Sequence, residues 1–240
     1  MAWTKGKTAA VAVALVVILS GAITILVNAG YFQSRENRIY NGGVNHFHAL
    51  PNRLYTYPDG DETTREYILA LFKRFHREAD PARDLKSDRE LTEQDIRTRP
   101  IYIYGSPENH SLFRRIRAQL PIVFESDGIV VGKKKCMGRD VGAIFACPNP
   151  LNPEQRIAVY GAVSPDAVKN MNGVFHGPTD YVVFNNATRR LTEAQPNQRF
   201  LLEGAFDKSD RAHWRVDEEL QLLPPKELRQ ATAGAIVPRG

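Results

Sequence analysis

The residues best placed to do chemistry follow a predicted strand at 101–104. Gly105 and Ser106 end this strand, and Asn109 lies within one turn of it. Backbone N–H groups at the start of a helix favour an anion, and ligands of open α/β sheets sit at the carboxyl ends of strands. We therefore take Gly105, Ser106 and Asn109 as candidate ligand-binding residues. A plain capped helix, with Ser106 as the cap and Pro107 at the first helical position, is the simpler interpretation.

Catalysis by Ser106 is the alternative for the same turn. A serine hydrolase needs an exposed serine, a base and an orienting acid. Ser106 stands between a strand and a helix, as such a nucleophile does, but the sequence has no G-x-S-x-G there, and Pro107 removes an N–H that an oxyanion hole would use. His110 is too close along the chain to be an ordinary triad base. The pattern favours binding over catalysis, with no catalytic residue and no cofactor.

Histidine and cysteine offer two further candidates. His46 and His48 form a His-Phe-His motif that could chelate a metal, although a surface loop is the simpler interpretation because such motifs often occur by chance. Cys136 and Cys147 lack the CxxC spacing of a structural zinc site. An oxidising compartment would allow these two cysteines to pair as a disulfide between neighbouring strands, and two free, partly buried thiols are the other possibility.

An apolar segment near the start of the chain indicates where the rest of the protein lies relative to a membrane. No charged side chain occurs from Thr8 to Ser34, and a bilayer core takes roughly 20 apolar residues as a helix. We predict a short cytoplasmic leader at 1–7 and a single-pass transmembrane signal-anchor at 8–32. A signal peptide cut after Ala29 is the alternative. The anchor would put the following domain on the periplasmic, or extracytoplasmic, side of the membrane.

The remainder of the chain predicts one domain between a tether and a tail. Residues 33–62 are rich in turn residues and are interpreted as a tether. Residues 63–217 alternate strand and helix patterns, which is typical of α/β domains, and 218–240 are interpreted as a flexible tail. The fold class is therefore α/β: one transmembrane helix followed by a single small Rossmann-like or flavodoxin-like sheet domain with helices.

Local patterns locate the main elements of this domain. Apolar residues at three- and four-residue steps predict a helix over 63–78, and Thr92 caps a short helical turn. Ser164 caps another helix at 166–171. Short β-branched or aromatic runs predict strands at 101–104, 122–124, 128–131, 142–146, 156–160 and 180–184.

Several of these segments resemble a known module. They are Leu91–Glu93 (LTE), Ile101–Asn109 (IYIYGSPEN), Ile129–Gly132 (IVVG), Asp140–Phe145 (DVGAIF), Pro148–Pro153 (PNPLNP) and Asp180–Phe184 (DYVVF). Together, over roughly 85–215, they resemble an accessory α/β module attached to some secreted bacterial esterases and prolyl-oligopeptidase-like hydrolases. The hydrolase domain itself is absent here, so no catalytic residue is carried over. The resemblance implies a small extracytoplasmic α/β domain in an accessory or binding role.

Charge and motifs together lead to a functional expectation. The net charge is +5 and the pI about 9.2, but the basic residues are scattered, so nucleic-acid binding is not expected. We expect a non-enzymatic, membrane-anchored binding protein, an accessory or structural subunit of a membrane protein complex, whose partners are the membrane and other membrane protein subunits. The alternative is an envelope hydrolase or ligand-binding enzyme with its site at the Gly105–Asn109 turn.

Overall fold

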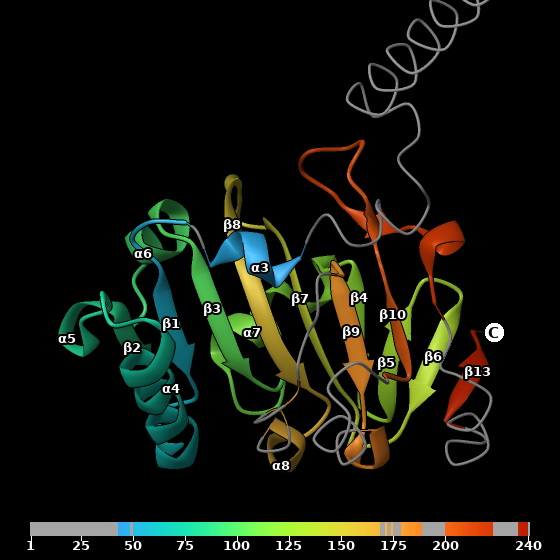
Figure 1. The fold of residues 1–240 in the computed structure, drawn as a ribbon, viewed down its shortest axis with the longest axis horizontal. Coiled ribbons are helices and arrows are strands. Elements are labelled where there is room, and N and C mark those ends of the chain that lie inside the picture. The colour runs from blue at the N-terminus through green and yellow to red at the C-terminus, as the bar shows by residue number, and fades with distance from the viewer. Residues whose placement is uncertain are drawn as a thin grey trace, which may run out of the picture. The chain divides into compact units, whose positions relative to one another are not determined.

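The computed structural model describes residues 43–48, 50–168, 171, 174, 179–188, 200–222 and 235–239, except for the side chains of residues 45 and 46. The body of this part is a seven-stranded mixed sheet in the order β10-β9-β7-β8-β3-β1-β2 (Figure 1). Its strands are β1 (Leu54–Tyr57), β2 (Leu85–Ser87), β3 (Ile101–Gly105), β7 (Gly142–Asn149), β8 (Asn152–Ala162), β9 (Tyr181–Phe184) and β10 (Leu202–Gly204).

The sheet has a parallel half and an antiparallel half. Strands β2, β1, β3 and β8 run parallel, with Tyr55 opposite Tyr102 and Tyr104 opposite Tyr160. Strands β7, β9 and β10 continue the sheet in antiparallel fashion. The helices between β1 and β3 in the chain are α4 (Glu62–Phe75), α5 (Pro81–Asp84) and α6 (Glu93–Thr98). The carboxyl ends of the parallel strands thus form one edge of the sheet and the amino ends the other.

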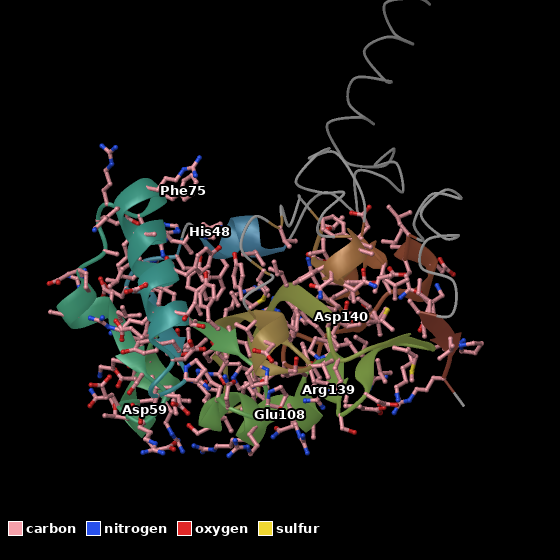
Figure 2. All side chains as sticks on the ribbon, turned by 90° about the horizontal axis from the view of Figure 1, so that it is seen from below. His48, Asp59, Phe75, Glu108, Arg139 and Asp140 are labelled. Carbon is pink, nitrogen blue, oxygen red and sulfur yellow. The ribbon has the colours of Figure 1, made fainter. Side chains whose placement is uncertain are left out.

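Each face of this sheet buries its own apolar core. One face packs against α6 and α7 (Ser111–Ile116), with η1 (Arg117–Gln119) following α7. The other packs against α3 (Val44–Phe47), α4 and α8 (Pro165–Val168). Since successive strand residues point to opposite faces, Ile101 and Ile103 enter the first core while Tyr102 and Tyr104 enter the second. At the end of α4, Phe75 is 61% exposed (Figure 2).

A smaller sheet covers the first face. It contains β4 (Ile122–Glu125), β5 (Gly128–Val131), β6 (Lys134–Met137) and β13 (Ile236–Pro238), in the order β13-β6-β5-β4 and all antiparallel. A two-stranded sheet pairs β11 (Phe206–Asp207) with β12 (Arg215–Val216), and η3 (Glu218–Leu220) follows it. The Cys136 side chain of β6 belongs to the same core as Phe124 and Phe145, so the small sheet and the central sheet share this core.

The PNPLNP segment forms the turn between β7 and β8. The last register pair is Asn149 with Asn152, next to an irregularity at Pro148. The Asn149 Nδ2 donates to the carbonyl of Ile96 at 2.7 Å, and the Asn152 Nδ2 donates to the carbonyl of Arg97 at 2.6 Å. Carbonyls in the last turn of a helix lack intrahelical donors, so this turn caps and positions the end of α6.

The fold prediction needs two corrections. In the ranges that the structure describes, no helix has both the length and the apolar character needed to cross a bilayer. The predicted signal-anchor at 8–32 and leader at 1–7 lie outside those ranges, and the single-pass membrane architecture is withdrawn. The α/β class agrees with the structure, but the single sheet does not, because two smaller sheets accompany the central one.

The predicted tether and tail also contain regular structure. Residues 54–57, within the predicted tether, form β1, which lies between β2 and β3 in the central sheet. The same tether contains α3, where the sequence pattern predicts an irregular segment. Within the predicted tail, η3 forms a short helix and β13 pairs with β6. The domain therefore begins before residue 63 and extends beyond residue 217.

Candidate functional site

The predicted Gly105–Asn109 site lies at the carboxyl end of β3 and is closed by its own hydrogen bonds. The Ser106 side chain is fully buried. Its N–H and its Oγ both donate to Asn109 Oδ1 at 2.9 Å, and the Glu108 N–H donates to Ser106 Oγ at 3.3 Å. The side-chain groups expected to bind a ligand therefore bind each other. Figure 2 shows Glu108 beside Arg139, to which its carboxylate is paired at 2.9 Å.

The helix after this turn begins later than expected. The sequence predicts Ser106 as its cap with Pro107 in the first turn, but α7 begins at Ser111 and its cap is His110. The Asn109 side chain, by accepting two bonds from Ser106, stabilises a separate turn before the helix. No helix N-terminus therefore opens at Ser106, which removes the physical basis for an anion site there.

His110 has a structural role in the described fold. Its Nδ1 accepts a bond from the Phe113 N–H, so the proton is on Nε2, which donates to Thr56 Oγ1 at 2.9 Å. The Thr56 hydroxyl in turn donates to the Tyr102 carbonyl at 3.1 Å. Burial lowers the pKa of His110 to about 4, so the imidazole is neutral at pH 7. Both nitrogens are used in holding α7 against β1 and β3.

The predicted metal and disulfide residues have other surroundings. His48 Nδ1 is hydrogen-bonded to the Tyr102 hydroxyl, and the side chain of His46 lies outside the described set. Over the described ranges, no group of three His, Cys, Asp or Glu side chains is arranged to hold a metal ion. Cys136 and Cys147 are free and buried. They belong to different sheets and not to neighbouring strands of one sheet, and the two thiols are unpaired, as in the free-thiol alternative.

A pocket of about 270 Å³ opens instead at the amino ends of the parallel strands. We call it the Tyr55 pocket. It is lined by Leu50, Pro51, Asn52, Arg53, Tyr55, Glu78, Ala79, Arg83 and Asp84. These residues come from the segment before β1, from β1 itself and from the region between α4 and β2, so the pocket forms only when the parallel half of the sheet is assembled.

Tyr55 is the unusual residue of this pocket. Its side chain is 1% exposed, and its ring stacks on Tyr102 with centroids 4.3 Å apart. Its hydroxyl has no hydrogen-bond partner among the described residues. Burial raises the pKa of Tyr55, and the Arg53 and Tyr102 side chains oppose this shift, Arg53 by its charge and both by weak polar contacts that do not meet the distance and angle of a full hydrogen bond. A buried hydroxyl without a partner costs roughly 1–3 kcal/mol.

Two arginines fix the wall around Tyr55. Arg53 donates to the Leu50 carbonyl at 3.0 Å and pairs with Glu78. Arg99, just outside the lining, donates to the carbonyls of Asn52, Arg53 and Arg83 at 2.9–3.0 Å and to Asp84 Oδ1 at 2.7 Å. These bonds join the loop before β1 to α5. The backbone beside Tyr55 is therefore held in place without a ligand.

Charges of both signs line the Tyr55 pocket. Arg53 and Arg83 face Glu78 and Asp84, which gives two positive and two negative side chains. Asp84 is saturated, because it accepts from Arg83, Arg99 and the Asp80 N–H. Burial alone would raise the pKa of Asp84, but these donors hold it below its usual value. Glu78, at 62% exposure of its side chain, retains accepting capacity.

Sequence reasoning misses this pocket because Tyr55 falls in the predicted tether. The available signal is the run Leu54-Tyr55-Thr56-Tyr57, which has strand composition between two turn segments. Nothing in the sequence indicates that the Tyr55 hydroxyl lacks a partner, since that depends on the packing of β1 against β3 and α4.

Comparison with known proteins finds no relative of this chain. The sequence matches no family, and neither the curated proteins nor the solved structures include a match to this chain. Any functional inference therefore rests on the geometry of the described residues.

Proposed function

We propose that this chain is a non-enzymatic binding protein that holds a small polar ligand in the Tyr55 pocket. The observation that carries the proposal is the Tyr55 hydroxyl, which is buried, unpartnered among the described residues, and adjacent to a pocket of about 270 Å³. A ligand that accepts a hydrogen bond from this hydroxyl would recover the free energy lost by burying it. The raised pKa keeps the hydroxyl protonated and able to donate.

The charges of the lining indicate the kind of ligand. An acceptor group beside Tyr55 would also lie near the Arg53 and Arg83 guanidiniums, while Glu78 could accept from a donor. A zwitterion such as a free amino acid presents a carboxylate and an ammonium group within one small molecule. The pocket is below the roughly 300–1,000 Å³ of sites for drug-sized ligands, which favours a ligand of this size.

Support for binding over catalysis comes from the carboxyl edge of the sheet. The envelope-hydrolase alternative requires Ser106 to be an exposed nucleophile with a nearby base. Ser106 is buried and bonded to Asn109, and both nitrogens of His110 are engaged. The accessory role toward a partner protein, expected from the sequence, remains part of the proposal, with ligand binding as its molecular basis.

A ligand screen with a matched pair of variants tests this proposal. We expect at least one of the twenty standard amino acids to raise the melting temperature of the full chain, with an affinity that falls about fivefold in Tyr55→Phe, since one hydrogen bond contributes on the order of 1 kcal/mol. Tyr57→Phe, the same change two residues along β1, should bind as the unmodified chain does. Equal affinity in both variants, or no binding by any amino acid, would contradict the proposal.

A further inference from the structure

A second pocket lies at the same edge of the sheet and shares Leu50 with the first. Its volume is about 240 Å³. Its walls come from three regions of the chain: α3 and the residues on either side of it, the β7–β8 hairpin, and the loop between β11 and β12. The residues that matter for its chemistry are Phe47, Leu50, Ala146, Arg156, Lys208 and Trp214. We call it the Trp214 pocket.

Two cations gather around the indole of Trp214. The Arg156 Cζ is 4.8 Å from a ring centroid of Trp214, and the Lys208 Nζ is 5.0 Å from one. Such cation–π contacts hold a charged group over a ring. Arg156 and Lys208 are both exposed to solvent, and their contacts with the same ring hold the two charged groups beside each other at the pocket.

The two cations differ in how far they are neutralised. Lys208 pairs with Asp180 Oδ1 at 2.7 Å, and Asp180 is itself buried and accepts from the Phe206 N–H through Oδ2 at 2.9 Å. Arg156 has no carboxylate within ion-pair distance in the described part of the chain. Of the two cations that line the pocket, only Lys208 is paired with a carboxylate among the described residues, so one positive charge has no ion-pair partner. An anion is the ligand that this charge favours.

Three other side chains that line the Trp214 pocket are apolar. Phe47 is 1% and Ala146 is 4% exposed, and Leu50 is partly buried beside them. Burying apolar ligand surface against these side chains contributes roughly 25 cal/mol per Å². A fully polar anion would not bury apolar surface against these side chains. An anion with a short apolar tail would contact both the apolar side chains and the two cations.

We propose that the Trp214 pocket binds a small monocarboxylate with an apolar tail, the carboxylate at Arg156 and Lys208 and the tail against Phe47, Leu50 and Ala146. This site is separate from the proposed amino-acid site, although Leu50 lines both pockets. Its volume suits a chain of a few carbons.

Tryptophan fluorescence gives a site-specific test. The chain has two tryptophans, Trp3 and Trp214, so a Trp3→Phe background leaves Trp214 as the sole indole. We would titrate this protein with sodium hexanoate at constant ionic strength. The expected result is a saturable change in Trp214 emission, with about tenfold weaker binding of acetate, which lacks the tail, and of hexanol, which lacks the charge.

Paired arginine variants in the same background test the location of the site. Arg156→Gln should weaken hexanoate binding about tenfold, as expected for loss of one charge-assisted contact. Arg117→Gln removes an exposed arginine of η1 and should leave it unchanged. Circular dichroism checks that both variants fold. Tyr55→Phe should also leave hexanoate binding unchanged, which separates failure of this proposal from failure of the amino-acid site.

Three results would overturn the inference. Equal binding of acetate and hexanoate would show a general surface response to anions. Equal binding of hexanol and hexanoate would show that the charge has no part. Equal hexanoate affinity in Arg156→Gln and Arg117→Gln would place the site elsewhere.

Discussion

At the scale of single residues, two buried polar side chains illustrate opposite outcomes of burial. His110 has both ring nitrogens satisfied by Phe113 and Thr56. The Tyr55 hydroxyl, one strand residue before Thr56, has no partner among the described residues. A satisfied polar group specifies a fold, whereas an unsatisfied one costs stability and marks a place where a ligand can contribute. This contrast distinguishes structural His110 from Tyr55 as a candidate ligand contact.

Because His110 is neutral in the folded state, its burial should make stability depend on pH. Its pKa is lowered from 6.5 to about 4, so the unfolded chain binds more protons between these values. Stability is therefore unaffected by His110 above pH 6.5 and falls by about 3 kcal/mol as the pH drops to about 4. Urea unfolding at pH 7, 5.5 and 4.5 should show this loss. His76, whose pKa is also lowered by burial, acts in the same direction.

Two glutamine variants isolate the part due to His110. His110→Gln should remove most of the pH dependence in that window, whatever its effect on stability at pH 7. His213→Gln, at an exposed histidine, should retain it. An NMR titration in which the His110 imidazole protonates near 6.5 would refute the assignment directly.

At the scale of elements, local side-chain bonds decide where the short helices begin. In α6, Thr92 Oγ1 accepts from the Asp95 N–H and Asp95 Oδ2 accepts from the Thr92 N–H, both at 3.0 Å. This reciprocal capping box satisfies donors at the start of a helix only six residues long. Such a helix is not stable alone, so its cap and its contacts with Asn149 and Asn152 determine whether it forms.

Removing the cap of α6 should therefore have a measurable cost. We expect Thr92→Ala to lower the free energy of unfolding by about 1 kcal/mol, as for other N-caps. Thr98→Ala in the same helix removes only an exposed bond from Thr98 Oγ1 to the Gln94 carbonyl, and should change stability by less than about 0.5 kcal/mol. Chemical denaturation of the two variants compares these values; similar losses would mean that the cap contributes nothing special.

Sequence patterns are most informative where local signals suffice. The aromatic stripe predicts α4, Thr92 and Ser164 are correctly predicted as helix caps, and β3, β4, β5 and β9 lie within a residue or two of their predicted bounds. At Ser106 the same reasoning is wrong, because the competing bonds from Ser106 to Asn109 form a turn. Both signals are present in the sequence, and only tertiary packing decides between them.

Local sequence patterns could not identify the residues of either pocket, and the reason differs from that at Ser106. Four-residue β1 is flanked by Pro51 and by Pro58-Asp59-Gly60, and this turn chemistry conceals a central strand. Arg156 and Trp214 are 58 positions apart in the chain, and neither they nor Lys208 belong to a recognisable motif. Contacts of this range become visible only once the order of the strands is known.

At the scale of the whole described molecule, β13 connects distant parts of the chain. It pairs with β6 through Ile236 and Cys136, and its neighbours add bonds from the Met137 N–H to the Ala235 carbonyl and from the Arg239 N–H to the Lys133 carbonyl. β13 thereby covers one edge of β6. An uncovered strand edge exposes unpaired backbone groups and opens more readily.

The rate at which a thiol reagent labels Cys136 should report on whether β13 covers the edge of β6. Burial raises the pKa of Cys136 to about 12 and raises that of Cys147, so both thiols should resist a thiol reagent until the protein unfolds. Deleting residues 235–240 should speed labelling of Cys136 at least about tenfold, since local opening of β6 becomes easier, and leave Cys147 unreactive. Mass spectrometry assigns the labelled cysteine. Faster labelling of both thiols would mean that the deletion destabilises the whole fold.

The pairing of β13 with β6 also bears on the order of folding during synthesis. The seven strands of the central sheet have all emerged once residue 204 has emerged, because β10 is the last of them in the described part of the chain. The first strand of the small sheet, β4, begins at residue 122, but the sheet is complete only after β13, residues 236–238, has been synthesised. At a synthesis rate of about 5–20 residues per second, β6 would carry an open edge for seconds after its neighbours have paired. A nascent chain stalled before residue 235 would therefore display a nearly finished fold with one strand edge exposed.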